Sequence, residues 1–151
     1  MNLRPDVAVA AIIEREQRFL IVEERIDSRI VLNQPAGRVE RGESLLAAVK
    51  RETWEETAWQ FTPVSLVGIY LWCNPSSGRD TIRFTFTGRV GTHDPNQALD
   101  HPIIATHWLT HAELQARTEA LRSPVVLRCI DDYLAGQRLP LSAIAEFGLG
   151  T

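Results

Sequence analysis

Three glutamates and an arginine lie within six residues of this sequence, in the segment 51–56 (Arg-Glu-Thr-Trp-Glu-Glu). On a helix, residues three and four positions apart share a face, so Glu52, Glu55 and Glu56 would present their carboxylates together. Like charges at this spacing repel one another and weaken a helix. Carboxylate oxygens are the ligands that hard cations such as Mg²⁺ and Mn²⁺ prefer. The spacing therefore favours a cation-binding helix over an ordinary solvated acidic face.

Gly37 and Glu43 extend this segment into a longer pattern: a Gly, five residues, a Glu, seven residues, then Arg-Glu-x-x-Glu-Glu. The pattern resembles the signature motif of the Nudix hydrolases, which cleave a phosphoanhydride in a nucleoside diphosphate linked to another group. The resemblance implies an α/β fold, the Nudix-type α/β/α sandwich with a mixed sheet, in a single domain over residues 1–151. Elements read from the sequence alone are compatible with that fold without singling it out.

Shorter stretches outside the motif are similar to the NudJ-type phosphatases, a subgroup of this family: 33–37, 83–86, 121–124 and 136–141. This similarity implies removal of the terminal phosphate from nucleoside tri- and diphosphates, and for some members action on thiamine-pathway pyrophosphates. One alternative is a Nudix pyrophosphohydrolase that releases pyrophosphate or cleaves a nucleotide sugar or dinucleotide. A second is a non-catalytic Nudix-fold nucleotide-binding or sensor domain, against which the three carboxylates argue.

The family resemblance assigns roles to the residues that match its motif. It implies a divalent metal, Mg²⁺ or Mn²⁺, held by the backbone carbonyl of Gly37 and by Glu52, Glu55 and Glu56. Glu52 and Glu56 are the first candidates for the general base, acting through a metal-bound water, and Asp100 is the second.

Arg51 matches the arginine that orients the catalytic glutamates in this family. Its planar guanidinium can hold a carboxylate by paired hydrogen bonds, and Glu43 could accept them. An ordinary acidic residue at a helix N-terminus is the equally open interpretation of Glu43.

Other polar and aromatic residues could bind the substrate. Tyr70 and Trp72 could stack on a base, or could equally belong to the core. Candidates for contacts to the substrate are Asn33, Gln34, Arg38, Arg41 and Arg83.

Two positions depart from the family motif. Thr53 stands where the motif has an aliphatic residue, and Ala58 where it has its final Gly. A Gly just beyond a helix usually adopts a left-handed conformation, which Ala tolerates poorly. We therefore expect either a different helix end or about 1 kcal/mol of strain at Ala58.

Composition bounds the remaining possibilities. A chain of 151 residues, 44% hydrophobic, can bury one sizeable core. The net charge of −3, without a basic block, does not indicate a nucleic-acid partner. The longest apolar run, 7–13, is too short to span a membrane. The N-terminus lacks a signal-peptide pattern, and the two cysteines match no metal or redox spacing, so we expect a cytoplasmic protein. The expected partner is a small-molecule substrate. The oligomeric state is left open.

Hydrophobic periodicity and turn residues predict the elements that position the acidic helix. A charged turn at 14–17 should join the first two strands, and 81–90 should be a strand with one buried face. We expect strands at 7–13, 19–22, 64–73, 81–90 and 103–109, helices at 43–54, 111–120 and 124–134, and loops at 24–28 and 91–101.

Overall fold

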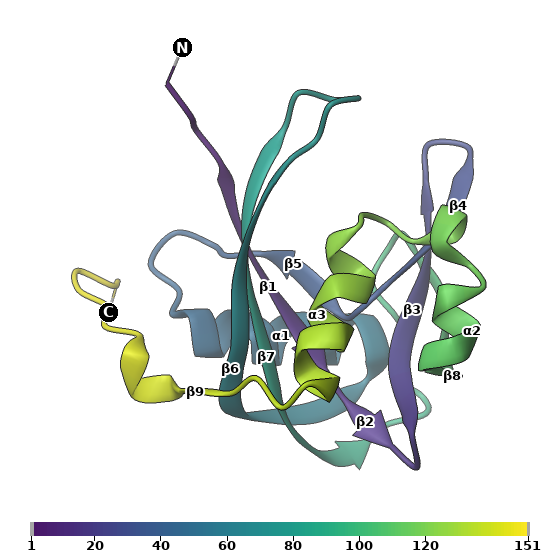
Figure 1. Cartoon of the computed structure of the whole chain (residues 1–151). Coiled ribbons are helices and arrows are strands. Elements are labelled where there is room, and N and C mark those ends of the chain that lie inside the picture. The colour runs from purple at the N-terminus through teal and green to yellow at the C-terminus, as the bar shows by residue number, and fades with distance from the viewer. Residues whose placement is uncertain (1, 151) are drawn as a thin grey trace.

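The computed structural model describes residues 2–150 and contains two β-sheets with helices packed on both sides (Figure 1). The larger sheet has the strand order β5-β1-β7-β6-β9. Strands β1 and β7 run parallel, whereas the other neighbours are antiparallel, so the sheet is mixed, as expected. Its strands are β1 (Asp6–Ile12), β5 (Ala36–Arg38), β6 (Trp59–Cys73), β7 (Asp80–His93) and β9 (Leu139–Pro140).

The smaller sheet is built around its central strand β3, which pairs with β2 and β4 on one edge and with β8 on the other. The turn between β2 and β3 is tight, and both Glu16 and Gln17 have positive φ angles there, of 49° and 63°. Its strands are β2 (Glu14–Arg15), β3 (Arg18–Ile26), β4 (Arg29–Asn33) and β8 (Ile103–Thr110).

Helices lie on opposite sides of these sheets, which confirms the expected α/β/α sandwich. Helix α1 lies behind the sheets in Figure 1, and α3 lies in front, between β6 and β3. No helix in residues 2–150 is long and apolar enough to cross a membrane. The helices are α1 (Leu45–Thr57), α2 (His111–Gln115) and α3 (Val125–Leu134), with 3₁₀ turns η1 (Thr118–Ala120) and η2 (Leu141–Ala143).

Two hydrophobic clusters fill the spaces between these layers. One packs α1 against residues such as Val9, Leu20 and Phe86. The other packs α3 against the opposite faces of the same strands, through residues such as Ile12 and Phe19. Because successive side chains of a strand point to opposite faces, a strand covered on both faces needs a continuous apolar run.

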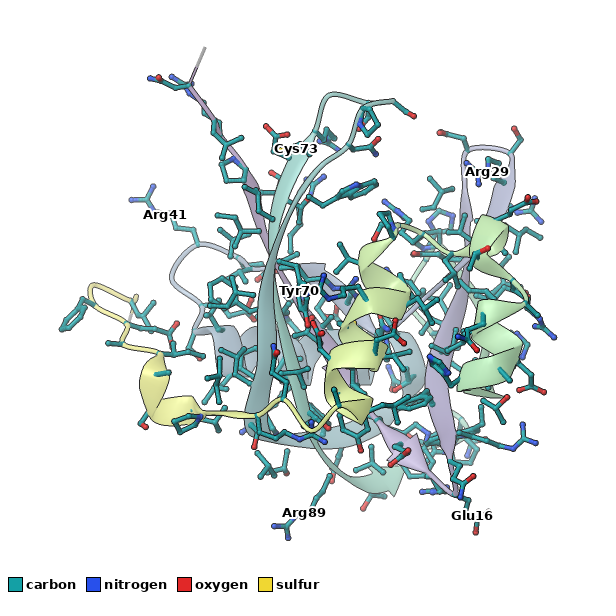
Figure 2. All side chains as sticks on the ribbon, viewed as in Figure 1. Glu16, Arg29, Arg41, Tyr70, Cys73 and Arg89 are labelled. Atoms are coloured by element: carbon teal, nitrogen blue, oxygen red, sulfur yellow. The ribbon has the colours of Figure 1, made fainter. Side chains whose placement is uncertain are left out.

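The expectation of one buried face on β7 was wrong. Phe86 is fully buried towards α1, but Arg83 and Thr85, on the other face, are only 8% and 0% exposed. Helix α3 covers that face; Figure 2 shows Tyr70 of the adjacent strand β6 directed towards it, and the Tyr70 hydroxyl donates a hydrogen bond to Asp132. Polar residues on β7 therefore face the protein interior.

Several element boundaries also differ from those expected. Strand β3 continues through residues 24–26, which were expected to form a loop, because β4 and β8 pair with both of its edges there. Strand β6 starts at Trp59 rather than 64, and β7 runs on to His93, inside the expected loop at 91–101. The helix expected at 111–120 ends at Gln115 and is followed by η1. No strand was expected at β4, β5 or β9, and β2 lies within the expected turn at 14–17.

Helix α1 begins two residues later and ends three residues later than expected. Ser44 caps its start by accepting a hydrogen bond from the Ala47 amide. At its end, Ala58 adopts the left-handed conformation, with φ 58° and ψ 22°, and its amide still donates to the Trp54 carbonyl. Of the two outcomes expected for Ala58, the structure thus has the strained one, in which an alanine adopts the geometry of a glycine.

Candidate active site

The glutamates of α1 lie where the helix meets the β1–β5 edge of the larger sheet. Gly37, in β5, pairs with Val9 of β1 and lies directly against the Glu52 side chain. A Cβ atom at residue 37 would overlap the Glu52 carboxyl group, so only glycine permits this approach. The backbone of β5 and a carboxylate of α1 are thereby brought into contact.

Arg51 organises the acidic residues around it. Its Nε and Nη2 donate a paired hydrogen bond to Glu43, at 2.7 and 2.9 Å, as expected. Its Nη1 donates to Glu52 at 2.8 Å and to Glu55 at 3.2 Å, and its Nη2 also donates to the Arg38 carbonyl. The hydrogen bond from Arg51 holds the pKa of Glu43 below its ordinary value, and Glu43 in turn raises the pKa of Arg51. One guanidinium therefore orients carboxylates from both the loop and the helix.

Glu56 is the most buried of the acidic residues on α1. Its side chain accepts a hydrogen bond from the Ala36 amide at 2.8 Å, and the residue is 8% exposed. Burial raises the pKa of Glu56 to about 9, and the negative charges of Glu52, Glu24 and Asp100 add to the effect. Burial is also the main cause that raises the pKa of Glu52, in opposition to its hydrogen bond with Arg51.

These carboxylates fit a divalent cation. Within residues 2–150, no three His, Cys, Asp or Glu side chains are already arranged as a complete metal site. Yet burial disfavours the charged forms of Glu52 and Glu56 and raises the pKa of each, and a bound cation would favour those charged forms. Glu52 also contacts Gly37, so carboxylate and backbone oxygens lie near each other at this position. Such oxygens are the ligands that a hard cation prefers.

Two acidic residues from other elements approach this group. The Asp100 amide donates to the Glu55 carbonyl at 2.8 Å, which brings the loop before β8 onto the end of α1. Glu24, in β3, is 6% exposed and accepts a hydrogen bond from Arg122 at 3.3 Å. Glu24 was not expected at this site, because residues 24–28 were expected to form a loop. Extending the alternation of 19–22 would have placed Glu24 on the same face as Leu20.

A cleft of about 790 Å³ opens beside the acidic helix and reaches it through Ala36 and Gly37. Residues of the β3–β4 and β6–β7 hairpins line its outer part. Arg29 and Cys73 mark these hairpins at the same end of the molecule in Figure 2. The cleft is of the size that binds small molecules.

Some of the residues expected to bind the substrate line the cleft, and others do not. Asn33, Arg38 and Arg83 line it, and so does Trp72, whereas Tyr70 packs against the core. Arg38 is largely exposed and forms an ion pair with Asp6 at 3.4 Å.

The other two candidates for substrate contacts do not line the cleft. Gln34 is 1% exposed and lies just beneath it. Arg41 projects away from the body of the molecule on the loop before α1 (Figure 2).

The fold and the acidic helix define a hydrolase of the Nudix type, and comparison with known proteins agrees. A model of the NUDIX domain matches residues 3–129, so the chain belongs to the Nudix family. Members of this family hydrolyse phosphoanhydride bonds and generally use divalent metals.

Relatives and solved structures give the same assignment. Phosphatase NudJ of Shigella boydii serotype 4 (strain Sb227) is 36% identical over 144 residues, which cover 95% of this chain and 93% of that protein. Phosphatase NudJ of Escherichia coli (strain K12) matches to the same extent. A NUDIX hydrolase from Nitrosomonas europaea, 43% identical, superposes with a TM-score of 0.93 over 95% of this chain and 98% of its own. A MutT protein from Methanosarcina mazei Go1, 22% identical, shares the fold, with a TM-score of 0.73 over 91% of this chain and 99% of its own.

Proposed function

We propose that this Nudix hydrolase removes the terminal phosphate from nucleoside tri- and diphosphates. The observation that carries the proposal is the junction of the acidic helix with the cleft, where Glu52 contacts Gly37 and Glu56 binds the Ala36 amide. The similarity to proteins named Phosphatase NudJ supports attack at the terminal phosphorus. Thiamine-pathway pyrophosphates, which also end in a free phosphate, are included as further substrates.

The metal in this proposal is Mg²⁺, with Mn²⁺ as the substitute. Its ligands are the Gly37 carbonyl and the carboxylates of Glu52, Glu55 and Glu56. A bound divalent cation supplies positive charge to the phosphate oxygens and makes nearby water more acidic. Arg51 keeps Glu52 and Glu55 oriented towards this position through its 2.8 and 3.2 Å hydrogen bonds.

Glu52 or Glu56 serves as the general base in this proposal, and Asp100 is the alternative. The position of Glu56 supports this role, because its side chain accepts a hydrogen bond from the Ala36 amide and Ala36 lines the cleft. Arg38, the last residue of β5, and Arg41, on the loop between β5 and α1, are proposed to contact phosphate oxygens. Arg38 is the better placed of the two because it lines the cleft.

A time course with GTP and Mg²⁺ tests the reaction. We expect GDP to rise before GMP, with orthophosphate released in each step, and no turnover when EDTA removes the metal. Pyrophosphate as the initial product, without accumulation of GDP, would refute terminal attack and identify a pyrophosphohydrolase. Binding of GTP without any turnover in Mg²⁺ would instead identify a binding domain.

We also propose that the chain acts as one domain over residues 1–151 and is cytoplasmic, with a small-molecule substrate and no nucleic-acid partner. The support for one domain is that β9 pairs with β6, and that Leu141 and Ile144 pack against the core beneath α1. Limited proteolysis tests this: cleavage should not release a stable fragment that lacks the C-terminal residues.

A further inference from the structure

Arg83 is a buried cation that forms no ion pair with the residues that the structure describes. It lies in β7 and is 8% exposed. Arg38, Arg51 and Arg122 each form an ion pair with a carboxylate. Within residues 2–150, no carboxylate forms an ion pair with Arg83. Removing a charge from water without a counter-ion is costly, so a buried arginine is normally paired.

Neutral amides hold the Arg83 guanidinium in place. Its Nη2 donates to Asn33 Oδ1 at 3.0 Å and to Gln34 Oε1 at 2.9 Å. Gln34 is itself fixed, because its Nε2 donates to the Val126 carbonyl at 2.7 Å. These contacts orient the guanidinium plane without supplying a negative charge, and Glu56 and Glu24 act on it only from beyond ion-pair distance.

The remaining donors of Arg83 are available to a ligand in the cleft. Its Nε and Nη1 form no hydrogen bond with the described residues, whereas the residue as a whole lines the cleft. Neither atom is sealed off, since Thr85 Oγ1 is the only fully buried side-chain nitrogen or oxygen without a partner in residues 2–150. Burial lowers the pKa of Arg83, but an arginine side chain stays protonated in proteins, so the charge persists.

Within the larger sheet, Arg83 and a second arginine, Arg38, lie on either side of a small residue, Ala8. Ala8 of β1 is in register with Arg38 of β5 on one side and with Arg83 of β7 on the other. Cross-strand neighbours in register share a face, and all three residues line the cleft. Two strand spacings of roughly 5 Å separate the two arginine backbones, and the alanine leaves the space between them open.

We propose that Arg83, oriented by Asn33 and Gln34, binds the free terminal phosphate of the substrate and thereby selects against diphosphates esterified at both ends. A terminal phosphate carries close to two negative charges at neutral pH, whereas a phosphate esterified on both sides carries one. A rigid guanidinium fork suits such a group. The selected substrates are then nucleoside di- and triphosphates, and the rejected ones are nucleotide sugars and dinucleotides. This inference rests on the proposed function, because it concerns the phosphate that is removed.

The test compares GDP with GDP-mannose, which differ in whether the terminal phosphate is free. Initial rates in saturating Mg²⁺ give kcat/KM for the wild type, for Arg83→Gln and for Arg83→Lys. We expect the wild type to prefer GDP by at least about a hundredfold. Arg83→Gln should lose about a hundredfold on GDP but less than about fivefold on GDP-mannose, and Arg83→Lys should recover part of the loss. Arg89→Gln, on the exposed part of the same strand (Figure 2), is the matched control and should change neither value by more than about twofold.

Thermal unfolding in EDTA checks that the variants remain folded. Arg83→Gln removes the donor to Oε1 of the buried Gln34, so it should lower the unfolding temperature whether or not Arg83 binds a ligand. The comparison of substrates separates ligand binding from a structural role, because a distorted cleft would lower kcat/KM on both substrates alike. Equal losses on both substrates, or a wild-type preference for GDP-mannose, would each overturn the proposal. The products from GTP are scored separately: pyrophosphate release would refute the proposed function, while the preference between GDP and GDP-mannose would still report on Arg83.

Discussion

Replacing Glu56 with glutamine should stabilise the metal-free protein, by an amount that grows with pH. Glu56 has a pKa of about 9 in the folded protein, against an ordinary value of 4.5. Between these values the folded state keeps a proton that the unfolded state releases, so stability falls as the pH rises through this interval. Glutamine has the shape of the protonated carboxyl group, and its side-chain oxygen can still accept the hydrogen bond from Ala36.

The size of the effect follows from the pKa difference. Each pH unit above 4.5 costs the wild type about 1.4 kcal/mol. The stability gained by Glu56→Gln should therefore rise from about 1 kcal/mol at pH 5 to about 3 kcal/mol at pH 7. Wild-type stability should fall over the same range and level off near pH 9.

Urea unfolding in EDTA at pH 5, 6 and 7 measures these differences. Glu40→Gln is the control, because the Glu40 side chain is 70% exposed and its replacement should change stability by less than about 0.5 kcal/mol at each pH. Adding Mg²⁺ should stabilise the wild type more than the Glu56 variant, since a ligand that binds only the folded state raises its stability. A stability gain that is the same at pH 5 and pH 7 would refute the reasoning.

Three further predictions follow from individual contacts. Glu56→Gln should also lose about a hundredfold or more in kcat at saturating Mg²⁺, and activity within a few-fold of the wild type would exclude it as a metal ligand. Ala58→Gly should be less destabilising than the control Ala47→Gly, on the exposed face of α1, by at least about 1 kcal/mol in urea unfolding. The reason is that only residue 58 has a left-handed backbone, which glycine adopts without strain. Equal effects of the two substitutions on the free energy of unfolding would contradict the strain at Ala58. The Glu146 carboxylate accepts a hydrogen bond from the first amide of α1 at 3.0 Å. Glu146→Ala should therefore lower the free energy of unfolding by about 0.3–1 kcal/mol, and Glu146→Gln should stay closer to the wild type. An unchanged free energy of unfolding in the alanine variant would show that this contact does not stabilise the helix.

The core of the candidate site could be predicted because its contacts are local in the chain. Glutamates three and four residues apart share a helix face whatever surrounds the helix. The pair between Arg51 and Glu43 spans only eight residues across the start of the same helix. The Ser44 cap and the strained end at Ala58 are likewise properties of the helix and its flanking residues. For these features the order of residue types is sufficient.

The cleft could not be predicted in the same way, because its contacts join distant parts of the chain. Arg83 meets Asn33 and Gln34 across 50 and 49 residues, through the pairing of β1 with β7 and the packing of α3. Glu24 becomes a buried neighbour of Glu56 only because β3 continues between β4 and β8.

The sequence by itself determined the acidic helix, its orienting arginine and the family to which they belong, since spacing along one element decides which side chains share a face. Only the tertiary structure decided that the polar face of β7 is buried under α3, and that its arginine forms no ion pair with any carboxylate of residues 2–150. The physical reason is that burial and charge compensation depend on strand register and on what covers each face. Both are set by packing between elements rather than by the residues of any one of them.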